Sequence, residues 1–216
     1  IDIQNVFDKK KNKTFRHGNV KRWILIKESK CIGRIAAFYN NKTKNLDGRI
    51  SIGGCGFFEC INNQKAANLL FETCKNWLKS NKIEGMDGPI NFGERDKWWG
   101  CLVEGFDINP NYQQNFGKRY YKKLFETYGF KVLFKQFTFT KKITSPLSER
   151  LYYKAKVAMK NPNYNFKHLK LSQLEKYTND FRKIYNEAWA KYPGVSKMSS
   201  LQAKSIMNQL KPIIDE

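Results

Sequence analysis

The sequence predicts an α/β fold with a mixed, mainly antiparallel sheet and flanking helices. Two observations carry this prediction. Trp23–Ile26 and Cys31–Tyr39 are apolar segments joined by Lys27–Lys30, a turn whose composition is typical of an antiparallel hairpin. Further along, a strand ending at Ile61 leads into an amphipathic helical segment and then into a strand over Ile83–Phe92. A strand, a crossover helix and another strand form a parallel pair, so we expect both strand directions in one sheet.

The remaining elements follow from local patterns. The third strand region, Ile50–Ile61, contains three glycines, which indicate a bulge or a close backbone approach. The helix after Asn63 runs to about Lys79 and has one apolar stripe, so it packs one side on the sheet. Beyond it, the sequence predicts a helix over about Lys118–Tyr128 ending at Gly129, a strand over Lys131–Thr140, a basic helix over Leu147–Lys160, a short strand over Phe166–Leu171, a helix opened by a capping box at Ser172–Glu175, and a helix over Ser200–Leu210.

A compositional shift divides the chain near Lys141–Pro146. We expect a first domain over 1–142 whose N-terminal part is missing, a linker and basic helix over 143–165, and the truncated start of a second domain over 166–216. Both ends have the look of cuts through a longer protein, because the chain begins at Ile1 and stops just after a helical pattern.

The net charge of +21 comes almost entirely from lysine. It leaves two interpretations open: a polyanionic partner, or the Lys- and Asn-rich composition that an AT-rich genome gives to any solvated surface. Arginine, which is preferred for bidentate phosphate contacts, is scarce, so nucleic acid is a possible but not a favoured partner.

The five cysteines have no paired spacing, and with two histidines they do not predict a metal site. Buried free thiols fit a reducing cytoplasm. Because no apolar run approaches membrane-spanning length, we expect no membrane partner.

Several stretches resemble the GCN5-related N-acetyltransferase (GNAT) superfamily. Tyr120–Lys131 resembles its last helix and the Gly-Phe entry into its final strands, and Phe57–Phe92 resembles its coenzyme-binding strand, helix and following strand. More narrowly, the chain resembles an uncharacterised bacterial family of tandem GNAT-like proteins, in which Asp180–Trp189 would be the first helix of a second domain. The stretches that carry this narrower resemblance are Gly33–Phe38, Gly54–Glu59, Gly85–Phe92 and Leu102–Phe106.

The resemblance implies an acyl-coenzyme A site at the start of the helix after Asn63, where backbone N–H groups would bind pyrophosphate. The glycine pattern of this turn is absent: Gln64 stands at the first glycine, and only Ala66 conforms. Lys65 could offset phosphate charge or could simply be solvated. The candidate cofactor-binding residues are Cys60, Ile61, Asn62, Asn63, Gln64, Lys65, Ala66 and Ala67.

The same resemblance places Phe125 where many GNAT enzymes have the tyrosine that protonates the departing thiolate. Tyr121 or Tyr128 could substitute as the acid, although aromatic residues at helical spacing are commonly core. Glu59 stands where such enzymes often place the general base, and it could equally be a satisfied carboxylate on a sheet.

A cluster of charged and aromatic residues follows the predicted strand that ends at Phe92. Such a cluster could line a pocket for an amine or a sugar, or it could form an ion-paired surface turn. Its candidate substrate-binding residues are Asn91, Glu94, Arg95, Trp98 and Trp99.

Three functional hypotheses follow. The first is an N-acyltransferase that moves an acyl group from acetyl-CoA or another acyl-CoA to a small-molecule or peptide amine. The second is a degenerate GNAT-like domain that supports another domain or binds a ligand without catalysis. The third is an aminoacyl-tRNA-dependent transferase, since tandem GNAT-like domains with basic surfaces also occur in that class. We expect the first.

Overall fold

The computed structural model describes residues 2–42, 44–45, 50–93, 97–192, 195 and 197–216. The chain divides into two compact units, Ile1–Lys135 and Gln136–Glu216. The division falls inside the segment that was predicted as the last strand of the first domain.

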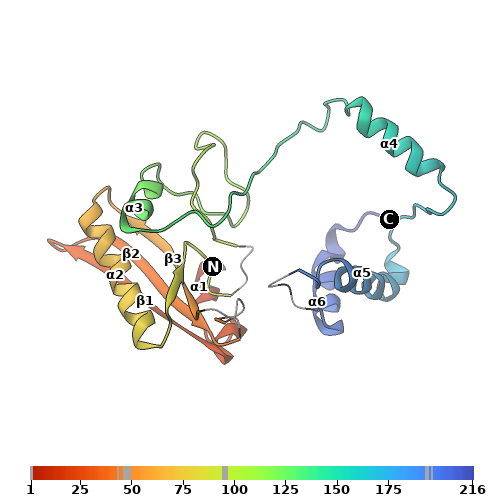
Figure 1. Ribbon diagram of the computed structural model, residues 1–216. Helices are drawn as coiled ribbons and strands as arrows, with labels where there is room; N and C mark the ends of the chain where they lie inside the picture. The colour runs from red at the N-terminus through yellow and green to blue at the C-terminus, as the bar shows by residue number, and fades with distance from the viewer. Residues whose placement is uncertain (1, 43, 46–49, 94–96, 193–194, 196) are drawn as a thin grey trace. The chain divides into compact units, whose positions relative to one another are not determined.

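The first unit contains a four-stranded mixed sheet, as the sequence predicted (Figure 1). Its strands are β1 (Gly18–Lys27), β2 (Lys30–Asn40), β3 (Ile52–Cys60) and β4 (Gly85–Asp87), and they lie side by side in this order. The pairs β1–β2 and β2–β3 are antiparallel, and β3–β4 is parallel. The predicted hairpin turn between β1 and β2 is confirmed at Glu28 and Ser29, both of which have positive φ.

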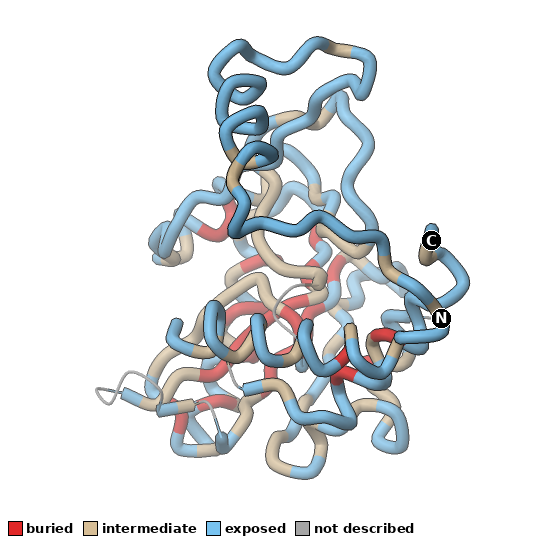
Figure 2. The backbone as a smooth tube through the Cα atoms, turned by 90° about the vertical axis from the view of Figure 1, so that its right-hand side faces the viewer, coloured by how far each residue is buried: buried red, intermediate tan, exposed pale blue. Residues whose placement is uncertain are grey.

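Helices cover one face of the sheet and the N-terminal segment covers the other. Helix α2 (Gln64–Ser80) and helix α3 (Tyr121–Tyr128) pack on the face that carries the main core cluster. The short α1 (Asp2–Val6) and the 3-10 turn η1 (Lys13–Arg16) lie in the segment that supplies Val6, Phe7 and Phe15 to a smaller cluster on the opposite face. Most buried residues belong to β2, β3 and α2, and Figure 2 draws the buried residues in red.

Aromatic rings fill the space between β3, α2 and α3. Phe58 of β3 stacks on Phe71 of α2 with centroids 4.9 Å apart, and Phe125 of α3 lies 5.0 Å from Phe58 and 4.8 Å from Phe71. All three side chains are buried. Phe125, which replaces the expected tyrosine, is therefore a core residue that joins α3 to the rest of the unit.

Several predicted elements are shorter or absent. The predicted strand over Ile83–Phe92 is reduced to β4, and the predicted helix over Lys118–Tyr128 begins only at Tyr121. Lys131–Thr140 and Phe166–Leu171, predicted as strands, form no strand. Alternation of side chains alone does not make a strand, because the backbone also needs a neighbouring strand to pair with. The predicted stop at Gly129 is confirmed: it has φ of 119° and caps α3.

The second unit contains helices α4 (Glu149–Lys160), α5 (Leu174–Ala188) and α6 (Ser200–Leu210), with 3-10 turns η2 (Leu171–Gln173) and η3 (Lys211–Ile213). The predicted helices over Leu147–Lys160 and Ser200–Leu210 are confirmed within two residues. Helices α5 and α6 pack together and bury Thr178, Ala203 and Met207.

The predicted capping box at Ser172–Glu175 is wrong. The 3-10 turn η2 occupies these positions, and α5 begins without a side-chain cap. A capping box instead opens α6, where Ser199 and Gln202 bond to each other's backbone N–H groups.

Candidate functional site

The outer edge of β3 is open over its second half. β4 pairs with β3 only from Ile52 to Gly54, and the N–H of Ile90 donates to the carbonyl of Cys55 one residue further on. At Gly56 the two segments touch, since a Cβ there would lie 1.9 Å from the carbonyl oxygen of Ile90. From this point to Cys60, no strand among the described residues lies beside β3 on that edge.

A β-bulge interrupts β3 at the start of this open edge. Arg34 pairs with Glu59 and Ala36 with Gly56, so two residues of β3, Phe57 and Phe58, stand opposite one residue of β2. Phe57 has φ of 54°, which is strained for a residue with a side chain. Bulges are frequent beside active sites because they redirect side chains and end strand pairing. Here the bulge shifts the alternation by one residue, so that Cys55, Phe58 and Cys60 share the main core cluster while Phe57 packs against the cluster on the other face.

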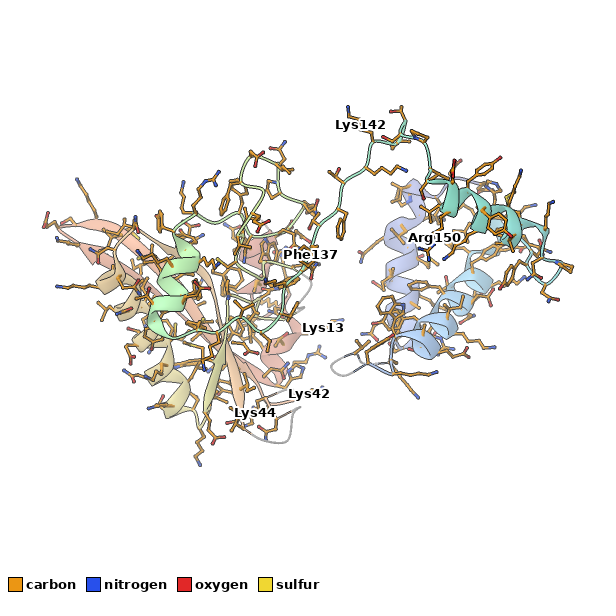
Figure 3. The ribbon with its side chains drawn as sticks, turned by 45° about the horizontal axis from the view of Figure 1, so that its top comes forward. Lys13, Lys42, Lys44, Phe137, Lys142 and Arg150 are labelled. Atoms are coloured by element: carbon orange, nitrogen blue, oxygen red, sulfur yellow. The ribbon has the colours of Figure 1, made fainter. Side chains whose placement is uncertain are left out.

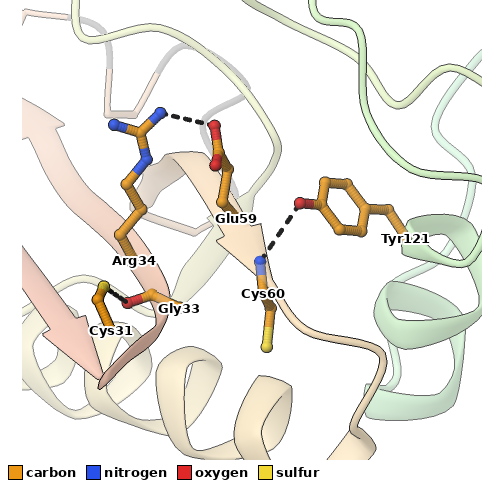
Figure 4. Close-up of polar contacts among 6 residues, drawn as sticks. All are labelled: Cys31, Gly33, Arg34, Glu59, Cys60 and Tyr121. Atoms are coloured by element: carbon orange, nitrogen blue, oxygen red, sulfur yellow. Dashed lines mark hydrogen bonds and ion pairs between the residues drawn. The ribbon is translucent and has the colours of Figure 1, made fainter. Parts of the chain in front are cut away.

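Two adjacent tyrosines bind the backbone of Cys60 at the end of the open edge. The hydroxyl of Tyr120 donates to the carbonyl of Cys60 over 2.9 Å, and the N–H of Cys60 donates to the hydroxyl oxygen of Tyr121 over 3.3 Å (Figure 4). These two hydrogen bonds satisfy the backbone C=O and N–H of Cys60, which have no neighbouring strand to pair with on this edge among the described residues. Tyr120 was not among the predicted site residues, because its contact with Cys60 depends on how α3 packs beside β3, which no local motif indicates.

Tyr121 is the better placed of the two predicted acids. Burial raises the pKa of the Tyr121 phenol, so the hydroxyl keeps its proton at neutral pH. It accepts a hydrogen bond from Cys60, and its own proton has no acceptor among the residues that the structure describes. A neutral phenol with an uncommitted O–H at an open strand edge can donate a proton to a bound group.

Tyr128 has a different environment. Its hydroxyl donates to Oε1 of Glu72 over 2.7 Å, and burial, together with this bond, raises the pKa of Tyr128. The seven residues from Tyr121 to Tyr128 correspond to roughly 10 Å along the helix, so one bound group cannot reach both phenols. The structure thus separates the two tyrosines and places only Tyr121 at Cys60.

Glu59 lies at the same end of β3, on the sheet face opposite to the buried side chains of Phe58 and Cys60. Its Oε1 accepts a hydrogen bond from Nη2 of Arg34 over 2.7 Å, and both side chains are about half exposed (Figure 4). Such an exposed ion pair adds little to stability, but it orients the carboxylate. The carboxylate remains open to water, through which it could accept a proton.

Helix α2 begins at Gln64, four residues after Cys60. Oδ1 of Asn63 accepts a hydrogen bond from the N–H of Ala66 over 3.0 Å and caps the helix. The backbone N–H groups of Asn62, Gln64 and Lys65 have no acceptor among the described residues. Together with the helix dipole, such groups favour an anion.

The side chain of Gln64 does not extend over these N–H groups. Its Nε2 donates to the carbonyl of Leu124 over 3.0 Å and to Oδ1 of Asn68 over 2.8 Å, which fastens α2 to α3. The residue that replaces the expected glycine thus has a structural role. Ala66 and Ala67, also predicted at this site, are buried against the core, and Ile61 is exposed.

Of the predicted substrate-binding residues, the structure brings Trp98 to the bulge. Its ring lies 6.4 Å from that of Phe57, and Phe57 also contacts Phe7 at 4.8 Å. Trp98 has φ of 46°, so two strained aromatic residues meet on this face. Trp99 lies elsewhere, with its ring 5.6 Å from that of Phe134.

Asn91 is buried and lines a cavity of about 30 Å³ beside Gly53 and Gly54, which has room for only one or two waters. Glu94 and Arg95 lie outside the described residues. No group of three His, Cys, Asp or Glu within the described part of the chain is arranged to hold a metal ion. No helix in the described part is long and apolar enough to cross a membrane.

Two curated proteins are similar to the chain. A bacterial ceramide synthase from Caulobacter vibrioides (strain NA1000 / CB15N) is 23% identical over 208 residues, which are 96% of this chain and 53% of that protein. Protein YghO from Escherichia coli (strain K12) is 28% identical over 108 residues, which are 50% of this chain and 27% of that protein. The chain therefore spans about half the length of the first relative, and its match to the second covers about a quarter of that protein. No protein-family model and no solved structure matches it.

Proposed function

We propose that the chain carries the acyl-transfer site of an N-acyltransferase, which moves an acyl group from a coenzyme A thioester to an amine. One observation carries the proposal. The open edge of β3 ends at a tyrosine whose proton is uncommitted and continues into a helix N-terminus with unpaired N–H groups. Transfer from a coenzyme A thioester uses these two features, a proton donor for the departing thiolate and a site for the phosphate charge of the coenzyme.

The roles of the residues follow from their positions. The amine nitrogen attacks the thioester carbonyl, the C–N bond forms, and the C–S bond breaks. The N–H of Cys60, which now donates to Tyr121 over a long bond of 3.3 Å, can donate to the thioester carbonyl oxygen once the donor displaces that hydroxyl. The thiolate takes its proton from Tyr121, and the proton that the amine loses passes through water to Glu59. The phosphates of the donor bind at Asn62–Lys65.

The similarity to a protein named ceramide synthase supports the same reaction class, since ceramide is the amide of an amine and a fatty acid. We therefore propose lipid amines as the first acceptors to test. The aromatic surface of Phe57 and Trp98, which lies on the same face as Glu59, is a suitable contact for an apolar acceptor.

A non-catalytic role is the second candidate. Tyr120 and Tyr121 already satisfy both backbone groups of Cys60, and Gln64 occupies the turn as a bridge to α3. A domain that had kept the scaffold and lost the reaction would have these same contacts. The two candidates differ in whether a donor displaces the bond between Cys60 and Tyr121.

The test is calorimetric titration of the chain with acetyl-CoA and with a long-chain acyl-CoA, followed by mass spectrometric detection of amide formed from a lipid amine. Micromolar binding and product are expected. Exchange of Tyr121→Phe should lower the rate by roughly 100-fold or more, the usual loss when a positioned acid is removed, whereas Tyr128→Phe should leave it nearly unchanged. Binding without product would favour the non-catalytic role, and no heat with any donor would refute the proposed donor site.

A further inference from the structure

Residues 136–170 form a continuous stretch of the second unit in which no residue is buried. Only Ser145, Ala158, Asn161 and Leu169 are even half-buried. We call this stretch the exposed basic segment. It contains helix α4, whose twelve residues include no core position.

The exposed basic segment is strongly cationic. Glu149 is its only acidic residue. Against it stand eight basic residues, and Figure 3 labels two of them, Lys142 before α4 and Arg150 in its first turn. The basic residues are Lys141, Lys142, Arg150, Lys154, Lys156, Lys160, Lys167 and Lys170.

The same segment exposes an unusual amount of apolar surface. Large aliphatic and aromatic side chains occur along its whole length, and each is more than half exposed. So many exposed large apolar side chains within one short segment favour a binding surface. These residues are Phe137, Phe139, Ile143, Leu147, Leu151, Tyr152, Tyr153, Val157, Met159, Tyr164 and Phe166.

Helix α4 gathers many of its apolar side chains on one side, although two others lie elsewhere. At 100° per residue, Leu151, Tyr152, Ala155, Ala158 and Met159 fall within one third of its circumference. Arg150 and Lys160 fall on the opposite side, together with the exposed Tyr153 and Val157. Lys154 and Lys156 fall at the two borders of the apolar side. Lysines at these borders can extend their charged ends to a polar surface while the apolar side is buried.

The charge pattern discriminates between the possible occupants. A second copy of the chain would bring a like-charged segment against this one, at a cost in repulsion. RNA would neutralise the lysines but would leave Ile143, Leu147 and Met159 in water. The surface of an anionic phospholipid bilayer offers both phosphate charge for the lysines and a hydrocarbon boundary for the apolar side.

We propose that the exposed basic segment docks on the surface of an anionic phospholipid bilayer, with α4 lying in the plane of the interface and its apolar side turned to the acyl chains. This docking is peripheral, and so it replaces the expectation of no membrane partner, which considered only membrane-spanning runs. It does not depend on acyl transfer and would stand if the transferase proposal failed.

The experiment is co-sedimentation of the full chain with phosphatidylcholine vesicles, with or without phosphatidylglycerol. Binding is expected only with phosphatidylglycerol. Combined exchange of Arg150, Lys154, Lys156 and Lys160 to Gln should lower the partition coefficient by at least ~100-fold, because each basic side chain near an anionic surface contributes roughly fivefold. The pair Leu151→Ser and Met159→Ser should lower it by ~10-fold or more, since it removes two buried apolar side chains.

The matched control exchanges Lys9, Lys10, Lys11 and Lys13 to Gln, which removes the same charge from an exposed stretch of the first unit. It should leave vesicle binding within about twofold of the original. Because every exchanged side chain is exposed, all variants should keep the circular dichroism spectrum and the urea midpoint of the original chain.

Three results would overturn the proposal. A control that weakens binding as much as the α4 variant would show that only net charge acts. Equal binding to vesicles with and without phosphatidylglycerol would show that the anionic lipid is not required. If tRNA displaced the chain from vesicles, and the Leu151→Ser and Met159→Ser pair did not weaken binding to tRNA, the segment would be assigned to RNA instead.

Discussion

Exchange of the two tyrosines at Cys60 separates structural support from catalysis. Tyr120→Phe leaves the carbonyl of Cys60 without its donor, and Tyr121→Phe leaves the N–H of Cys60 without its acceptor. Both changes keep the aromatic ring, so the contact of Tyr121 with Phe58, at 5.1 Å between centroids, is retained. Each variant therefore loses one hydrogen bond and little packing.

The stability cost of the two variants should be similar. A single neutral hydrogen bond contributes about 1 kcal/mol, and both tyrosines are only partly buried, so each variant should lose about 1 kcal/mol in the free energy of unfolding. For a unit of this size, that loss lowers Tm by roughly 4 °C. Their effects on acyl transfer should differ, because only Tyr121 has a proton to give: roughly 100-fold or more for Tyr121→Phe, and a fewfold for Tyr120→Phe.

The assay combines three measurements on each variant. Urea denaturation gives the free energy of unfolding, and amide formation gives the rate. Hydrogen exchange of the Cys60 amide, followed by NMR, tests the contact itself. Tyr121→Phe should speed the exchange of this amide, and Tyr120→Phe should affect it less, since Tyr120 binds the carbonyl.

Two results would refute the reasoning. If the Cys60 amide exchanged equally fast in the original chain and in Tyr121→Phe, the hydroxyl would not be bound there. If both variants lost the same fraction of activity, their effect would be structural and Tyr121 would not be the acid.

The remaining predictions concern the supports of the site. Gly56→Ala should lower the free energy of unfolding, measured by urea denaturation, by at least ~2 kcal/mol, because the new Cβ would stand 1.9 Å from the backbone oxygen of Ile90. Gly85→Ala should change the same free energy by less than ~1 kcal/mol, because the nearest atom to its Cβ is a side-chain atom at 3.2 Å. Equal effects at the two glycines would contradict the close approach at the open edge. The hydroxyl of Tyr128 lowers the pKa of Glu72, and this lowering favours the folded state only while the carboxyl is ionised. Tyr128→Phe should therefore destabilise the chain at pH values above 4.5, the ordinary pKa of the glutamate. The loss in the free energy of unfolding should be below ~1 kcal/mol, because the carboxylate is partly exposed, and it should vanish as pH falls through the lowered pKa of Glu72. If the urea midpoints of the variant and the original chain differed by the same amount from about pH 7 to about pH 3, this linkage would be excluded.

The periodic segments were predictable from the sequence because their signals are local. The hairpin of β1 and β2, the amphipathic α2 and the stop at Gly129 each depend on a few neighbouring residues. The mixed sheet followed from the strand–helix–strand unit in the same way. The missing strand over Lys131–Thr140 was not predictable, because a strand depends on a partner that side-chain alternation does not specify.

For the candidate site, the sequence determined which residues stand at the end of β3 and at the start of α2, since chain order alone places Glu59, Cys60 and Gln64 in succession. Only the tertiary structure decided what they do there. The bulge at Phe57 depends on strand pairing between residues 20 to 25 positions apart. The hydrogen bonds of Tyr120 and Tyr121 with Cys60 join residues about sixty positions apart. Such contacts are set by how α3 packs on the sheet, and local sequence carries no record of that packing.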